Sequence, residues 1–298
     1  MSPVESPSIS RSWLFVPTDS GAKLARAQQS PAHRLILDLE DGVGPQPAHK
    51  QAARDNMQAW LGANPSQAGR TFVRVNPLGS PFIMDDLRAA ADAGAAGVVL
   101  PKCEGPADVH RLCALLDPVE TAAGMAVGRM GIVAIATETA RGLQCLPDFR
   151  APLPRLQGLM WGAEDLCADL QGSTNRHADT GRFLSPYRHA RDACLIAARA
   201  CGVTPIDAVY TAFRDEDGLR RECVEHRALG FGHKAAIHPA QVAVIDLAFQ
   251  PDAHERAWAE AVVHAFGNAS GGLAQLNGQM LDMPHLRRAR QILGMDGS

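Results

Sequence analysis

The sequence predicts an α/β protein whose main part is a (β/α)8 (TIM) barrel, followed by a C-terminal helical extension. Eight short apolar runs recur along the chain, separated by stretches rich in Ala, Leu and Arg that have a helical composition. The first run starts at Ser12 and the eighth at His233, so the repeat averages about 32 residues, close to a βα unit. The runs are continuously apolar, as expected of strands buried on both faces of a parallel sheet.

These eight runs are the expected strands, in chain order: SWLFVP from Ser12, RLILDLE from Arg34, TFVRVN from Thr71, GVVLPK from Gly97, GIVAIATE from Gly131, LQGLMWG from Leu156, TPIDAVY from Thr204 and HKAAIHP from His233. SPYRHARDACLIAARACG should be a helix, because Ser185 can cap it, Pro186 suits its first turn and Gly202 follows its end. A doubly wound open sheet is the alternative. It is disfavoured because no run is followed by a complete G-x-G-x-x-G and no G-x-x-x-x-G-K-[ST] occurs.

The chain is expected to have three parts. Residues 1–10 should be a disordered tail, because MSPVESPSIS lacks the basic start and apolar stretch of a signal peptide. Residues 11–250 should form the barrel, and residues 251–298 exceed what a barrel requires. In this C-terminal helical extension, the small-residue linker GNASGG should let the last segment, NGQMLDMPHLRRARQIL, move as a lid.

Composition argues against several functions. The formal net charge is -3 without any run of Lys or Arg, so no nucleic-acid partner is expected. No stretch of about 18 apolar residues occurs, so no membrane span is expected. The seven cysteines lie singly without a C-x-x-C pair, which favours reduced thiols and a cytoplasmic location. The histidines at 226, 233 and 238 match no zinc spacing.

Polar residues gather at the carboxyl ends of the expected strands, where the active sites of such barrels lie. In chain order they are Asp38, Glu40, Asp41, Arg74, Asn76, Lys102, Glu138, Glu164 and Asp165. So many carboxylates at one mouth repel one another unless cations balance them. Arg74 and Lys102 supply two charges, and a divalent metal would supply two more. Oxygen ligands without His or Cys favour Mg²⁺ over zinc. Alternatively, single acids cap the helices that follow.

Eight segments in order resemble the citrate lyase β-subunit-like (CitE-like) family of the HpcH/HpaI aldolase superfamily, related to malyl-CoA and citramalyl-CoA lyases. The segments are RSWLFVP, LILDLEDGV, RVNP, LPK, ETARG, WGAEDL, GFGHKAAIHPAQV and GQMLDMP, and they extend from Arg11 to Pro284. The resemblance implies a (β/α)8 barrel, Mg²⁺ for which Mn²⁺ can substitute, and CoA as part of the substrate. It also implies a homo-oligomer, a trimer or a hexamer, with active sites near subunit contacts.

The resemblance further implies roles for single residues. The family's metal-binding carboxylates correspond to Glu138 and Asp165, and its substrate-binding arginine corresponds to Arg74. In malyl-CoA lyase relatives, a late aspartate from a neighbouring subunit acts as acid or base, and it corresponds to Asp282. The backbone amides that hold the keto-acid carboxylate correspond to those of Gly162, Ala163 and Glu164.

The region expected to hold CoA departs from the family pattern. After the first strand the family often has P-G-s-R and a following Lys, whereas this chain has PTDSGAKLAR, with Thr18 and Ser20 in place of Gly and Arg. This departure leaves an acyl carrier protein as an alternative carrier of the thioester. The candidate CoA contacts are Lys23, Arg26, Ile237 and Pro239.

The expected reaction is retro-Claisen/aldol cleavage of a 3-hydroxyacyl thioester, of the malyl-, citramalyl- or citryl-CoA type, to an acetyl thioester and a 2-keto acid. Mg²⁺ on Glu138 and Asp165 would chelate the substrate's carboxylate and hydroxyl. Arg74 would stabilise the developing oxyanion, and Asp282 would protonate the thioester enolate.

Three further residues complete the expected site. Glu40 and Asp41 would bond metal waters or orient Arg74, and Lys102 would neutralise the acids rather than form a Schiff base. Structural alternatives are an ion pair of Arg74 with the acids of the second strand and an N-cap role for Asp282. Functional alternatives are a malyl-CoA-type thioesterase, a class II aldolase acting on free hydroxy-keto acids, and a non-catalytic scaffold.

Overall fold

The structure is a computed structural model, and it describes residues 10–267 and 271–295. The chain divides into two compact units, Met1–Phe249 and Gln250–Ser298. Apart from Ser10, the tail expected over residues 1–10 lies outside the described residues. Within the described ranges, no helix has the length and apolar character needed to cross a membrane.

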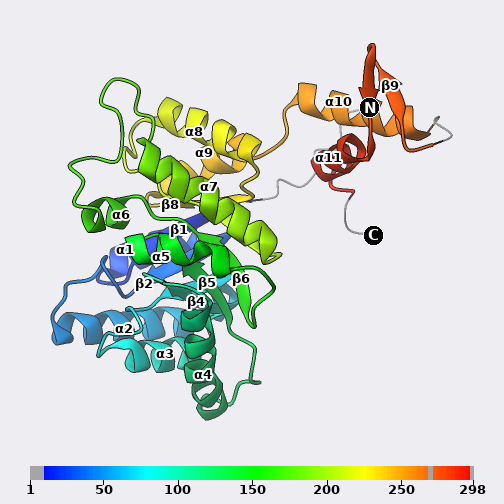
Figure 1. Cartoon of the computed structure of the whole chain (residues 1–298). Helices are drawn as coiled ribbons and strands as arrows, with labels where there is room; N and C mark the ends of the chain where they lie inside the picture. Colours follow the sequence, from blue (N-terminus) through cyan, green and yellow to red (C-terminus); the bar gives the residue numbers. More distant parts are fainter. Residues whose placement is uncertain (1–9, 268–270, 296–298) are drawn as a thin grey trace. The chain divides into compact units, whose positions relative to one another are not determined.

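Eight parallel strands close into a barrel in chain order, with β8 paired to β1 (Figure 1). The predicted (β/α)8 fold is therefore confirmed, and the open-sheet alternative is wrong. Each strand lies within the apolar run predicted for it. The strands are β1 Ser12–Pro17, β2 Arg34–Asp38, β3 Thr71–Arg74, β4 Gly97–Leu100, β5 Gly131–Ile135, β6 Leu156–Met160, β7 Thr204–Asp207 and β8 His233–Ala236.

Both faces of the barrel sheet are buried, as the continuous apolar runs predict. One cluster of side chains, including Trp13, Ile36, Phe72 and Ile206, forms one core. Neighbouring strand residues such as Leu35 belong to a second, larger core together with helix side chains. Alternation of successive side chains between the two faces explains this division.

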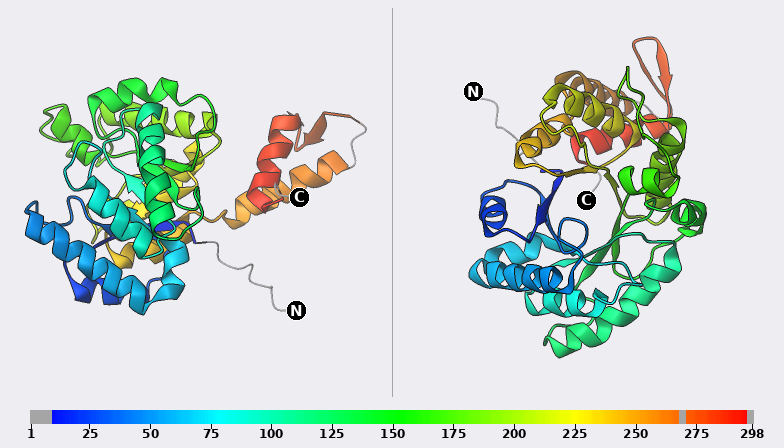
Figure 2. Two further views of the ribbon diagram at one scale, coloured as in Figure 1. Left: turned by 90° about the horizontal axis from the view of Figure 1, so that it is seen from below. Right: turned by 90° about the vertical axis from the view of Figure 1, so that its left-hand side faces the viewer.

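Helices connect the strands and stand around them (Figure 2). The predicted helix at Ser185 is confirmed as α7, but Ser185 is its first residue and Leu184 occupies the N-cap position, so the predicted cap is wrong. The helices of this unit are α1 Gly21–Gln28, α2 Pro47–Ala63, α3 Ile83–Asp92, α4 Pro106–Ala122, α5 Ala140–Cys145, α6 Glu164–Asp169, α7 Ser185–Ala200, α8 Glu216–Leu229 and α9 Pro239–Ala248, with 3₁₀ turns η1 Pro65–Arg70 and η2 Leu146–Asp148.

The second unit contains the predicted C-terminal helices, α10 Ala253–Gly267 and α11 Met283–Leu293. It also contains an unpredicted antiparallel hairpin of β9 Ala274–Leu276 and β10 Gln279–Leu281. The hairpin turns at residues 277–278, an Asn-Gly pair with φ of 49° and 79°, because two-residue hairpins favour turns that need positive φ. Within the predicted GNASGG linker, residues 268–270 lie outside the described residues.

Candidate active site

Arg74, at the end of β3, is held by carboxylates from the neighbouring β2. The parallel register sets Asp38 beside Arg74, and the Asp38 carboxylate accepts Nε and Nη2 of Arg74 at 2.8 and 2.6 Å. Nη1 of Arg74 lies 2.8 Å from Oε2 of Glu40. Burial lowers the pKa of Arg74, but the negative charges of Asp38 and Glu40 raise it by more. The pKa of Arg74 is therefore above its usual range. The ion pair that the sequence allowed as a structural alternative is therefore formed.

Lys102 follows β4 and brings a positive charge among the acids. Its ammonium pairs with Oε1 of Glu40 and lies 3.4 Å from carboxylate oxygens of Asp41 and of Asp165. Burial lowers the pKa of Lys102, but Glu40 and Asp165 raise it more, to a net value above the usual range. A protonated ammonium is not a nucleophile. The structure therefore favours charge balance over a Schiff base at Lys102.

Glu138 follows β5 and Asp165 lies in the first turn of α6. Glu138 is only 4% exposed, and its Oε2 accepts the amide of Lys102 at 2.6 Å. Burial, and after it the charge of Asp165, raises the pKa of Glu138 to about 8. Two neighbouring carboxylates repel each other when both are ionised, and a cation bound between them stabilises both charges. Carboxylate oxygens are the kind of ligand that Mg²⁺ prefers. These residues fit such a metal, which would favour the ionised form of Glu138.

A cavity of about 90 Å³ brings together six of the predicted site residues: Arg74, Glu138, Gly162, Ala163, Glu164 and Asp165. Gly162 and Ala163 belong to the loop between β6 and α6. That loop requires a glycine, because a Cβ on Gly162 would lie 2.8 Å from Cγ of Glu138. The amide of Gly162 donates to Oγ1 of Thr137 at 3.0 Å. The other residues that line the cavity are Phe15, Ile135, Met160, Trp161, Ala208 and Val209.

The predicted CoA contacts are not among the residues that line this cavity. Lys23 is exposed on α1 and pairs with Asp19 at 3.0 Å, and Arg26 lies in the last turn of the same helix. Ile237 and Pro239 follow β8, which pairs with β1. The two pairs therefore follow neighbouring strands at the carboxyl end of the barrel. Their contact with CoA stays a prediction.

Asp282 belongs to the second unit, where it immediately precedes α11. Its Oδ1 lies 2.6 Å from Nδ1 of His285, and its side chain is 53% exposed. Asp282 therefore occupies the N-cap position that the sequence allowed as an alternative. An N-cap residue can still deliver its carboxylate to a substrate, so catalysis by Asp282 stays a prediction.

A separate network of buried charged residues contacts Trp161, the first residue of the loop between β6 and α6. The potential ligand atoms of Asp207, Glu222 and His226 all lie within 4.8 Å of one another. The buried ammonium of Lys234 already donates to Asp207 at 2.6 Å and to Glu222 at 3.0 Å. Nε1 of Trp161 also donates to Asp207, at 2.7 Å. Because a protein cation occupies these carboxylates, we interpret the network as an anchor for the loop that starts at Trp161.

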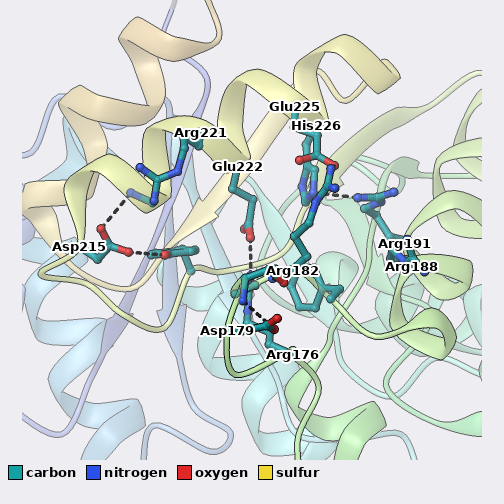
Figure 3. A pocket seen from close by; sticks show the side chains of 15 residues that line it. Arg176, Asp179, Arg182, Arg188, Arg191, Asp215, Arg221, Glu222, Glu225 and His226 are labelled. Carbon is teal, nitrogen blue, oxygen red and sulfur yellow. Dashed lines mark hydrogen bonds and ion pairs between the residues drawn. The ribbon is translucent and has the colours of Figure 1, made fainter.

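Figure 3 shows the pocket of about 570 Å³ beside this network. Arg176 pairs with Glu222 at 2.7 Å, and Nη1 of Arg191 lies 2.9 Å from Nε2 of His226. Arg182 pairs with a glutamate of α8, at 3.3 Å. Two ion pairs thus form among the charged residues that line this pocket.

Two further residues hold the site in place: Asp38, one of the acids with which the sequence allowed Arg74 to pair, and Lys50, to which the sequence analysis gave no role. Asp38 holds Arg74 and also accepts the amide of Glu40 at 2.9 Å. Lys50, 5% exposed, donates to the carbonyls of Leu39 and Glu40, each at 2.7 Å. The register between parallel strands sets Asp38 beside Arg74, as that alternative requires. Lys50 gives no such signal, because its partners are main-chain carbonyls.

Comparisons with known proteins show the family of the chain. The model of the HpcH/HpaI aldolase/citrate lyase family matches residues 11–239. A citrate lyase subunit beta-like protein of Mycobacterium tuberculosis is 37% identical over 285 residues, covering 96% of this chain and 95% of that protein. A (3S)-malyl-CoA thioesterase of Cereibacter sphaeroides is 34% identical over 292 residues, covering 95% and 93%. The crystal structure of M. tuberculosis CitE with magnesium, acetoacetate and coenzyme A has a TM-score of 0.81 at 36% identity, covering 97% of this chain and 98% of that one.

Fold and comparisons together place the chain among the (β/α)8-barrel enzymes of the citrate lyase and aldolase superfamily. The chain belongs to the HpcH/HpaI aldolase/citrate lyase family. The predicted family resemblance is therefore confirmed.

Proposed function

We propose that this protein is a Mg²⁺-dependent carbon–carbon lyase that cleaves a 3-hydroxyacyl thioester to an acetyl thioester and a 2-keto acid. The observation that carries this proposal is the convergence of Arg74, Glu138 and Asp165 on one cavity. It is supported by the related CitE, whose structure contains magnesium, acetoacetate and coenzyme A. Small substrates of malyl, citramalyl or citryl type would place a carboxylate and a hydroxyl in this cavity.

The charges of the site suit this reaction. Glu138 and Asp165 would hold the metal, which when bound supplies a Lewis acid for the substrate oxygens. Arg74, preorganised by Asp38, would donate to the oxyanion that develops as the hydroxyl becomes a carbonyl. The hydroxyl would lose its proton as it becomes a carbonyl, and the carbon–carbon bond would break with its electron pair passing to the thioester enolate. Asp282 would give the enolate carbon a proton, so that one proton is lost and one gained.

The remaining expectations extend this proposal. CoA would carry the thioester near Lys23, Arg26, Ile237 and Pro239, with an acyl carrier protein as the alternative carrier. The enzyme would work in the cytoplasm, in line with seven free cysteines. It would assemble as a homotrimer or hexamer, so that the C-terminal unit of one subunit can serve the barrel of another.

Hydrolysis of the thioester is the second candidate, favoured by the 34% identical (3S)-malyl-CoA thioesterase. The same residues would bind the substrate, but Asp282 would activate a water molecule instead of protonating an enolate. The two activities differ in their products, because hydrolysis releases a free thiol and leaves the hydroxy acid intact.

Metal removal tests the proposal. Activity on malyl-CoA should vanish in excess EDTA and return with Mg²⁺ or Mn²⁺. Glu138→Gln should keep the fold and lose metal affinity, measured by calorimetry, because a neutral amide is a weaker ligand of nearly the same volume. Glu216→Gln, with 64% of its side chain exposed, is the matched control. Full wild-type activity in excess chelator would refute the metal assignment.

A further inference from the structure

The amino-terminal mouth of the barrel contains a second polar cavity, at the end opposite the candidate active site. It measures about 650 Å³, and its lining includes Arg11, Gln157, Arg199 and His233. Arg11 directly precedes β1, and His233 opens β8. Because all eight strands are parallel, these residues lie at the end of the barrel that enzymes of this fold do not use for catalysis.

Nitrogen groups at this mouth lack partners. The guanidinium of Arg11 makes neither a hydrogen bond nor an ion pair with the described part of the chain, although its amide donates to Oδ1 of Asp246 at 2.7 Å. Among the described residues, Nδ1 of His233 and Nε1 of Trp13 are buried without a hydrogen-bond partner. The rings of Trp13 and His233 meet edge-on, with centroids 6.5 Å apart. Buried polar atoms without partners are rare in proteins, and a bound water molecule or ion is one explanation for them.

Positive charge accumulates around these atoms. The rings of His33 and His233 have centroids 5.1 Å apart. Burial, and after it the charges of His33, Arg11 and Arg34, lower the pKa of His233 to about 3. The nearby carboxylate, Asp246, acts on Arg11 and His33, but its oxygens already accept the amide of Arg11 and the hydroxyl of a serine. These hydrogen bonds come from neutral donors and leave the charge of Asp246 in place, so Asp246 offsets the charge of Arg11 while the positive charge of Arg34 remains.

We propose that this mouth is a binding site for a small multivalent oxyanion of the phosphate type. The guanidinium of Arg11 has planar donors that match two phosphate oxygens. Arg199 supplies a second guanidinium at the rim, and its Nη2 donates to the carbonyl of Gly230 at 2.5 Å. His233 would gain a charge-assisted hydrogen bond, since an anion favours its protonated form. Space is present, because a Cβ on Gly232 would meet nothing closer than 4.0 Å. The anion would bridge β1 and β8, the strands at which the barrel closes.

Calorimetric titration with inorganic phosphate tests the site. The protein is treated with EDTA, and ionic strength is held constant with NaCl so that general screening does not change. Wild type should bind one phosphate per chain, and Arg11→Gln should weaken binding by about tenfold or more, because a charge-assisted hydrogen bond is lost. Arg199→Gln should weaken it in the same direction. Arg150→Gln removes the same charge from a side chain that is 77% exposed, and should bind as wild type does.

An Arg74→Ala variant separates this site from the catalytic mouth and should bind phosphate as wild type does. If Arg74→Ala abolishes phosphate binding and Arg11→Gln leaves it unchanged, the anion binds at the catalytic end of the barrel. That result would overturn the proposal. Absence of saturable binding to wild type would overturn it as well. In NMR titrations, phosphate should raise the pKa of His233. A non-specific effect of charge would change the pKa values of histidines elsewhere in the protein as well. If glycerol phosphate competes with inorganic phosphate, the natural ligand is a phosphorylated metabolite. If it does not compete, the natural ligand is free phosphate, and both outcomes support the site.

Discussion

At the residue scale, the candidate site depends on how each charge is held. Arg74 is gripped by both oxygens of Asp38, and the amide of Lys102 holds Glu138. Each of these hydrogen bonds fixes the orientation of a charged side chain as well as stabilising its charge. Substitutions that keep the charge and change the geometry are therefore the informative ones.

Arg74→Lys should impair catalysis although the positive charge remains. A lysine cannot make the two parallel bonds to Asp38, so the donor aimed at the oxyanion would be misplaced. We expect kcat to fall on the order of 10²-fold, the usual cost of losing one such donor. Steady-state kinetics measure this, with Arg88→Lys as a control on an exposed arginine of α3. A near wild-type rate would mean that bulk positive charge suffices.

Glu138 should make the stability of the metal-free protein depend on pH. Its folded pKa is about 8, against an ordinary value of 4.5. Between these values the folded chain keeps a proton that the unfolded chain releases, so the stability contributed by this group falls as pH rises through the window. The Tm of Glu138→Gln relative to wild type, both in EDTA, should therefore increase from about pH 5 to about pH 8. A constant difference in Tm would show that the Glu138 pKa is not raised.

At the element scale, the sequence predicted all eight strands because each is a continuous apolar run. The hairpin of the second unit was missed, because each of its strands has only three residues, too few to show a period. The meeting of Arg74, Glu138 and Asp165 was predictable, since parallel strands share one carboxyl end. The pairing of Lys102 with Glu40, Asp41 and Asp165 was not, because it depends on side-chain conformations that strand order does not determine.

The loop between β6 and α6 should tolerate no side chain at Gly162. In Gly162→Ala the new methyl group would displace Glu138, whose Cγ lies 2.8 Å from the Cβ position. We expect the fold to persist and the Mg²⁺ affinity and kcat to fall about tenfold or more, as for changes next to metal ligands. Gly79→Ala is the control, because its Cβ would meet nothing within 4 Å. Calorimetry with Mg²⁺ that gives equal affinities for both variants would contradict this account.

At the scale of the whole molecule, the second unit carries Asp282 on a segment separate from the barrel core. We predict that Asp282 acts on the barrel of a neighbouring subunit. Asp282→Asn should fold normally and lose on the order of 10²–10⁴ in rate, the usual contribution of a positioned acid or base.

Subunit mixing distinguishes action between subunits from action within one. Inactive Asp282→Asn and inactive Arg74→Ala proteins, mixed and shown by mass spectrometry to have exchanged subunits, should regain part of the activity. Recovery requires an intact barrel to meet an intact Asp282 from another chain. Mixed oligomers that stay inactive would show that Asp282 serves its own barrel or has no chemical role.

Product analysis tests the central claim, carbon–carbon cleavage, most directly. The enzyme with Mg²⁺ is incubated separately with malyl-, citramalyl- and citryl-CoA, and the products are identified by mass spectrometry. The account predicts that at least one substrate yields acetyl-CoA and a 2-keto acid in equal amounts, at a rate that EDTA abolishes. Free CoA and an intact hydroxy acid, without any 2-keto acid, would contradict it and establish a thioesterase.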